Sequence, residues 1–124
     1  MAPKEKPDTL RGTLDLLILK VVALSPVHGY GISERIRLIS RDVLRVQQRS
    51  LLSGLRRLER HGWLVAEWGT SENGRPARFY RLSAKGRSQM AIEEATWNRL
   101  AEAITLIVRA PYQEAGTVGS VSCA

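Results

Sequence analysis

The chain has little of what enzymes and secreted proteins depend on. Its 124 residues include one cysteine, two histidines, and only 6% aromatic residues. The single cysteine, Cys123, can form no internal disulfide, which is typical of the reducing cytoplasm. Neither His28 nor His61 has a histidine, cysteine or carboxylate at ligand spacing, so we expect no metal and no cofactor. No Ser/His/Asp or Cys/His pattern and no cofactor fingerprint stands in the sequence, so we predict that the chain is not an enzyme.

Long apolar runs are also missing. The longest apolar region, Leu14 to Leu24, is interrupted by Asp15 and Lys20, so we expect no membrane association. The two ends are polar or lack periodicity. We therefore expect a flexible N-terminal arm over residues 1–10 and a disordered tail over residues 111–124.

Positive charge is concentrated in one stretch. Between Arg45 and Arg87 lie ten basic and three acidic residues, an excess of seven that equals the formal net charge of the whole chain, +7. The remainder holds nine residues of each sign and balances. A local excess of this kind, mostly arginine, is the electrostatic footprint of a surface that contacts phosphates.

A helix with two distinct faces is predicted from Arg49 to His61. Its leucines at positions i, i+4 and i+7 form a buried stripe. A second face carries long basic side chains and one hydroxyl, from Arg49, Ser53, Arg56 and Arg60. Arginine can hold a guanine edge with two hydrogen bonds or straddle a phosphate. A solvated amphipathic helix would show the same pattern, and only the segment that follows favours a groove-binding helix.

That segment is predicted to be a β-hairpin. Gly62 is expected to end the helix, and residues 63–68 and 78–82 are rich in β-forming types. Between them, Asn73, Gly74 and Pro76 mark a turn. A helix followed by two strands with a basic loop is the order of a winged helix-turn-helix. In such a domain the recognition helix enters the major groove and the wing reaches the phosphates or the minor groove.

Two helices are expected before the recognition helix. The first should run from Thr13, its N-cap, to Leu24, and it is apolar on most sides. This suggests that part of it packs against a second chain. The second should cover residues 30–40, after a connector in which His28 is a simple turn residue. A short third strand of the wing sheet is expected from Val43, Leu44 and Val46.

A long last helix is predicted from Ala84 to Arg109, with Ser83 as its cap. Gly86 should be tolerated in its first turn at a cost of up to about 1 kcal/mol relative to alanine. Residues spaced alternately three and four apart form a heptad seam with one polar member, Glu93. The apolar members are Met90, Trp97, Leu100, Ile104 and Ile107. The seam favours a dimerisation helix; the alternative is a helix folded back on the first helix of its own chain.

Several short motifs stand in a characteristic order. They are GTL at residues 12–14, HGYGI at 28–32, LRRLE at 55–59, GWL at 62–64 and RPARFYRLSAKG at 75–86. Over about residues 10–109 the chain thereby resembles the PadR-like transcriptional regulators. The resemblance implies a winged-helix homodimer, joined through its first and last helices, that binds an operator, usually as a repressor. It also implies that some members sense planar aromatic compounds near the dimer interface.

One motif departs from the family. The start of the recognition helix usually reads Ser-Leu-Tyr-Pro-Ala-Leu, whereas residues 50–55 here read Ser-Leu-Leu-Ser-Gly-Leu. Leu52 therefore stands at the tyrosine position and cannot donate a hydrogen bond to a phosphate. This affects the expected operator sequence and affinity more than the fold.

Together these patterns predict a mainly α protein with a small hairpin (α+β). It should have a winged helix-turn-helix at residues 11–83 and a dimerisation helix at 84–110. The residues expected to contact double-stranded DNA are Gln47, Gln48, Arg49, Ser50, Ser53, Arg56, Arg57, Arg60, Arg75 and Arg78. Those expected at the dimer interface are Leu14, Ile18, Met90, Trp97, Leu100, Ile104 and Ile107. A symmetric dimer should bind two-fold related half-sites about one helical turn apart. Trp97 is the expected contact for a small aromatic effector, or else simply a large seam residue.

Overall fold

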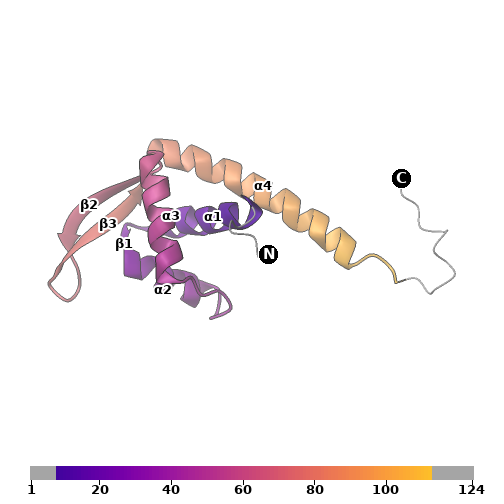
Figure 1. Cartoon of the computed structure of the whole chain (residues 1–124), viewed down its shortest axis with the longest axis horizontal. Coiled ribbons are helices and arrows are strands. Elements are labelled where there is room, and N and C mark those ends of the chain that lie inside the picture. The colour runs from indigo at the N-terminus through magenta and orange to yellow at the C-terminus, as the bar shows by residue number, and fades with distance from the viewer. Residues whose placement is uncertain (1–7, 113–124) are drawn as a thin grey trace, which may run out of the picture.

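Four helices and a three-stranded antiparallel sheet make up the part of the chain that the structure describes (Figure 1). The computed structural model describes residues 8–112. The helices are α1 Asp8–Leu24, α2 Gly29–Ile39, α3 Gln48–Arg60 and α4 Ala84–Val108. The strands are β1 Val27–His28, β2 Leu64–Thr70 and β3 Pro76–Leu82. This order confirms the predicted α+β class, including the recognition helix and the hairpin behind it.

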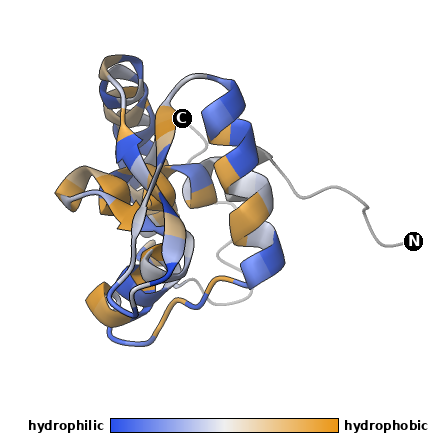
Figure 2. Cartoon of the chain, turned by 90° about the vertical axis from the view of Figure 1, so that its left-hand side faces the viewer, coloured by the Kyte–Doolittle hydropathy of each residue, from blue (hydrophilic) through white to orange (hydrophobic). Residues whose placement is uncertain are grey.

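Helix α1 lies at the centre of the core. It contacts α2, α3, α4 and β3, so its own chain covers much of the broad apolar surface that its sequence displays. The fully buried side chains come from three helices and the hairpin, namely Ile18, Leu19, Ile32, Leu51, Leu55, Leu58 and Leu64. In Figure 2, hydrophobic and hydrophilic residues alternate along these elements, as expected where each covers a shared core with one face.

The start of α1 corrects one prediction. The helix begins at Asp8, so Thr13 lies inside it and is not the N-cap. Residues 8–10 of the predicted arm are therefore helical. The rest of that arm, residues 1–7, and residues 113–124 of the predicted tail, with Cys123, lie outside the described residues.

The third strand of the sheet also differs from the prediction. It is β1, at Val27 and His28, and it pairs antiparallel with β3 at Tyr80 and Phe79. Residues 43–46, which were expected to form this strand, belong to the irregular connection between α2 and α3. His28 is thus more than a turn residue. Its Nδ1 accepts a hydrogen bond from the Gly31 N–H (3.1 Å) and so caps α2, and its ring meets Phe79 edge-on at 5.5 Å.

Helix α3 ends at Arg60 and, as predicted, Gly62 terminates it. This glycine has φ of +80°, a backbone conformation that residues with a Cβ rarely adopt. Its N–H donates to the Glu59 carbonyl, and the Trp63 N–H donates to the Leu58 carbonyl, each at 3.0 Å. This is the Schellman pattern of hydrogen bonds, and it turns the chain from α3 directly into β2.

Helix α4 is anchored where the hairpin ends. The Ser83 hydroxyl accepts a hydrogen bond from the Gly86 N–H (2.9 Å) and donates to the Gly62 carbonyl (2.6 Å), which confirms Ser83 as the cap. Gly86 is buried, and a Cβ on it would lie 2.1 Å from the Trp63 carbonyl oxygen. The prediction that glycine is merely tolerated at this position was therefore wrong, because alanine does not fit there.

The two halves of α4 have different surroundings. The first half lies on α1, where Met90 packs against the core and Lys20 Nζ lies 3.4 Å from Glu94 Oε1. The second half extends away from the globular part of the chain (Figure 1). The first half thus matches the alternative of a helix folded on its own α1, whereas the second half has no such support.

Candidate nucleic-acid interface

Helix α3 separates a buried face from an exposed one. Leu51, Leu55 and Leu58 are buried against the core, and Gly54 lets the helix approach α1 closely. A Cβ at Gly54 would lie 3.0 Å from Ile18 Cδ1. The opposite face is exposed to solvent and carries Arg49, Leu52, Ser53, Arg56 and Arg60. The four residues expected to share one accessible face of this helix do so.

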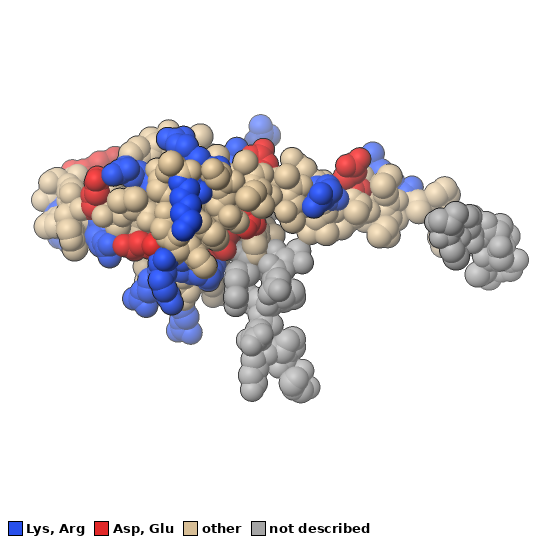
Figure 3. Space-filling model, turned by 90° about the horizontal axis from the view of Figure 1, so that it is seen from above, with Lys and Arg blue, Asp and Glu red and all other residues tan. Residues whose placement is uncertain are grey.

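The arginines of this face are not neutralised by the described part of the chain. Among the side chains that the structure describes, those of residues 12–112, no carboxylate lies within ion-pair distance of Arg49, Arg56 or Arg60. Arg56 and Arg60 line a shallow, open depression together with Glu59. Basic side chains project together from one edge of the globular part in Figure 3. The surface is therefore suited to a polyanion.

Arg57 does not belong to this surface. Its Nη2 pairs with Asp15 Oδ1 of α1, and the two side chains are 26% and 10% exposed. Asp15 is the one charged residue buried in the core of the described chain. Arg57 was predicted to contact DNA, but in the structure it lies on the flank of α3 that faces α1, and its guanidinium is engaged by Asp15.

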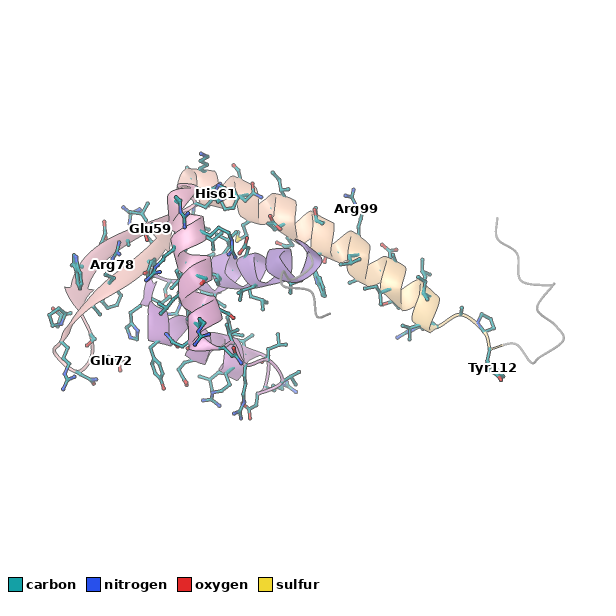
Figure 4. The ribbon with its side chains drawn as sticks, in the orientation of Figure 1. Glu59, His61, Glu72, Arg78, Arg99 and Tyr112 are labelled. Atoms are coloured by element: carbon teal, nitrogen blue, oxygen red, sulfur yellow. The ribbon has the colours of Figure 1, made fainter. Side chains whose placement is uncertain are left out.

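Arg78 of the wing is also paired. Its Nη2 lies 2.7 Å from Glu59 Oε2 on α3, and Figure 4 shows the two residues where the hairpin passes the helix. The Arg78 side chain is still 44% exposed. The pair therefore holds the wing against the recognition helix, while part of the guanidinium stays accessible.

The tip of the wing is a tight turn between β2 and β3. Gly74 has φ of +79°, and the N–H of Ser71 donates to the Arg75 carbonyl at 2.8 Å. The Asn-Gly pair thus forms the predicted turn. Arg75 is exposed beside it, and Glu72 lies at the same tip in Figure 4. The tip is therefore less basic than Arg75 alone suggested.

Trp68 is a residue of this surface that the sequence did not single out. In the hairpin Trp68 is opposite Arg78, so the two side chains point to the same face of the sheet. Nearer the helix this face is the core side, with Leu64 and Leu82 buried on it. Because the hairpin extends past the core, Trp68 is 73% exposed. The exposure of Trp68 therefore depends on how far the hairpin extends past the core, which the sequence does not indicate.

The connection from α2 to α3 sets the position of the recognition helix. Arg41 and Asp42 have φ of 56° and 69°, where glycine is the usual residue. Asp42 accepts hydrogen bonds from Arg45 and Arg37, chiefly from Arg45, and these lower the pKa of its carboxyl group. Arg45 is therefore bound within the connection and contributes less free charge than its place in the basic stretch suggested.

The residues at the start of α3 are open to solvent. Gln47 is the N-cap and its side chain makes no capping hydrogen bond; Gln48 is the first helical residue. Both are exposed, whereas Ser50 is half-buried. The two glutamine amides at the N-terminal end of α3 are thus accessible to a ligand.

The residues expected at a dimer interface fall into three groups. Ile18, contrary to a role at the interface, is fully buried in the core of its own chain and has no surface to offer a partner. Leu14 and Met90 are partly buried against the same core. The others lie on the projecting half of α4: Leu100 is half-buried, and Trp97, Ile104 and Ile107 are 42%, 47% and 75% exposed.

An apolar groove of about 400 Å³ lies between α1 and α2. It is lined by Leu17, Lys20, Val21, Leu24, Ile36, Ile39, Ser40 and Leu44. Leu24 and Ile39 on its rim are exposed. Trp97 does not line it, so in the single chain the expected effector residue and this groove are separate.

Comparison with known proteins agrees with this geometry. Residues 18–92 match the model of the Transcriptional regulator PadR-like family. The chain belongs to the PadR-like family of transcriptional regulators. A transcriptional regulator from Clostridium thermocellum is 25% identical with a TM-score of 0.74, and the match covers 85% of this chain and 99% of that one. A PadR-like transcription factor from Bacteroides fragilis is 28% identical with a TM-score of 0.65, covering 81% and 94%.

Membership settles two broader questions. PadR-like proteins are DNA-binding transcriptional regulators, which confirms the predicted class and the prediction that the chain is not an enzyme.

In the described range, 8–112, no helix is both long and apolar enough to cross a membrane. Over the same range, no group of three or more histidine, cysteine or acidic residues could hold a metal ion.

Proposed function

We propose that this PadR-like regulator binds a two-fold related operator as a homodimer and represses transcription. The observation that carries the proposal is the exposed face of α3, where Arg49, Arg56 and Arg60 project without an acidic partner among the described residues. An unpaired arginine gains most from a phosphate or a guanine edge, because it gives up no internal ion pair on binding.

The contacts would divide by their place on the helix. In helix-turn-helix proteins the N-terminal residues of the recognition helix meet base edges. Gln48, Arg49, Ser50 and Ser53 fall in this part, and Gln47 caps the helix just before it. Arg56, Arg60 and the wing residues Arg75 and Arg78 would then bind phosphates and fix the register. Arg57 takes no part in this scheme, because it is paired with Asp15.

The test is a binding titration on a duplex of the protein's own upstream region, beside a scrambled duplex, at several salt concentrations. Arg56→Ala combined with Arg60→Ala should weaken binding at least tenfold and lower the salt slope by about two for each protomer. The matched control is Arg99→Ala, since Arg99 is exposed on α4 far from α3 (Figure 4). Equal losses in the double variant and the control would refute the assignment of this face.

The proposal of a homodimer is based on the second half of α4, which projects from the globular part of the chain. Ile104, Ile107 and Val108 lie within about 100° of one another around the end of this helix, and all three are exposed in the single chain. Burying such a surface against a second copy would remove it from water. Sedimentation of the wild-type protein should give a dimer, and Ile104→Asp with Ile107→Asp should give a folded monomer. A monomeric wild-type protein at micromolar concentration would contradict the proposal.

Repression itself has a direct test in cells. A reporter driven by the bound upstream region should be low when the protein is present and should rise when it is removed. The Arg56→Ala, Arg60→Ala variant should behave like the deletion. A fall of the reporter on deletion would instead indicate an activator. Such a regulator would work beside the chromosome, in the cytoplasm expected from the sequence.

A second candidate function is sensing of a planar aromatic effector at the dimer interface. Trp97 supports it, because this large aromatic ring is 42% exposed on the part of α4 that would meet the second copy. A planar ligand should quench tryptophan fluorescence saturably in a variant that keeps only Trp97. Its binding should change operator affinity by the same factor by which DNA changes ligand affinity. If Trp97→Ala alters dimerisation but no ligand is bound, Trp97 is a seam residue.

A further inference from the structure

Of the four leucines of α3, only Leu52 is not buried in the core. The other three leucines of this helix are fully or almost fully buried, whereas Leu52 is 42% exposed. At about 100° per residue, Leu52 lies about 60° around the helix from Arg49 and about 40° from Arg56. It is therefore an apolar side chain at the edge of the basic face, between that face and the buried stripe.

Its position along the helix is equally specific. Leu52 lies in the second turn of α3, one turn after Gln48 and two turns before Glu59. Glu59 is held by Arg78 of the wing at 2.7 Å. Leu52 thus lies on the flank of the helix that faces the wing, in the N-terminal half of the helix, where helix-turn-helix proteins contact base edges.

The chemistry of the groove then limits what Leu52 can recognise. A leucine side chain neither donates nor accepts hydrogen bonds, so it gains nothing from a phosphate, a guanine edge or an amino group. The 5-methyl group of thymine is the apolar group that the major groove displays. We propose that Leu52 is a specificity-determining residue that packs on the methyl group of a thymine in each half-site. This inference rests on the proposed function, in which α3 occupies the major groove.

The experiment removes the methyl group alone. Duplexes are first enriched from a random-sequence library with the wild-type protein, and each thymine of the enriched site is then replaced by deoxyuridine. Base pairing and every hydrogen-bonding group are kept. We expect one thymine per half-site at which wild-type affinity falls about fourfold, which is the effect of burying one methyl-sized group. Leu52→Ala should bind the thymine and deoxyuridine duplexes equally well at that position.

The control is Leu38→Ala, since Leu38 is an exposed leucine on α2, 63% accessible. This variant should keep the full deoxyuridine penalty. The inference is overturned if no thymine shows a penalty with the wild-type protein, or if the penalty persists in Leu52→Ala. Enrichment of a specific site without any methyl dependence would overturn the role of Leu52 and leave the proposed function standing. No binding to any duplex at low salt would overturn both.

Discussion

Asp15 of α1 and Arg57 of α3 form an ion pair inside the molecule, with Arg57 Nη2 2.5 Å from Asp15 Oδ1. The pair joins the central helix to the recognition helix beside Gly54, where a Cβ would lie only 3.0 Å from Ile18 Cδ1. The Nε of Arg57 is buried without a hydrogen-bond partner among the described atoms. These features assign Arg57 to the packing of α3, whereas its neighbour Arg56 is exposed on the face proposed to meet DNA.

Replacing Arg57 should therefore change mainly the stability of the protein, whereas replacing Arg56 should change mainly its binding to DNA. Arg57→Ala leaves Asp15 buried without its partner and should lower the free energy of unfolding by about 2 kcal/mol. Arg56→Ala should change stability by less than about 0.5 kcal/mol but should weaken DNA binding and lower its salt slope. Urea denaturation and salt-dependent titrations measure the two effects. A stable Arg57→Ala protein with a reduced salt slope would show that Arg57 contacts phosphate after all.

Gly86→Ala should destabilise the protein, although alanine is the better helix former. The new Cβ would lie 2.1 Å from the Trp63 carbonyl oxygen, so the start of α4 has to move away from the end of α3. We expect a loss of about 2 kcal/mol in thermal or urea unfolding, typical of overpacking. Ser88→Ala, at an exposed position of the same helix, is the control and should be neutral or slightly stabilising. Equal stability of the two variants would mean that the packing at Gly86 is looser than described.

Helices α2 and α3 end with the same pattern of backbone hydrogen bonds, but different residues adopt the left-handed backbone conformation there. After α3 it is Gly62, and after α2 it is Arg41, with φ of 56°. Arg41→Gly should relieve left-handed strain and raise the free energy of unfolding by about 0.5 kcal/mol, after the entropy that glycine loses on folding. Gly62→Ala should lower it by about 1 kcal/mol. If Arg41→Gly destabilises, the Arg41 side chain must make a contact that offsets the strain.

Acid should weaken the α2–α3 connection through Asp42. Hydrogen bonds from Arg45 and Arg37 lower the pKa of the Asp42 carboxyl below its ordinary value of 3.8. A lowered pKa in the folded state means that the stabilisation is present above pH 3.8 and is lost as the pH falls through the folded-state value. Asp42→Asn should therefore have a lower free energy of unfolding than wild type at pH 7, and the difference should vanish once the pH is below the folded-state pKa of Asp42. A difference that is independent of pH would point to turn geometry and exclude the ion pairs as its cause.

Features set by neighbouring residues were predictable from the sequence. The leucine stripe of α3, the glycine after it, the Asn-Gly turn and the serine cap of α4 each depend on side chains within one or two turns. The structure confirms all four. The basic stretch also located the exposed arginines of α3, since a helix with one apolar stripe must present its other residues to solvent.

Tertiary structure decided the features that depend on distant partners. Arg57 reads like Arg56 in the sequence, and only the approach of Asp15, 42 positions away, takes it out of the basic face. Val27 and His28 form a strand because β3 offers them an open edge. Gly86 is required because the Trp63 carbonyl lies against it. In each case an atom from a distant segment occupies the space or pairs with the charge, and the neighbouring residues in the sequence do not predict where that atom lies.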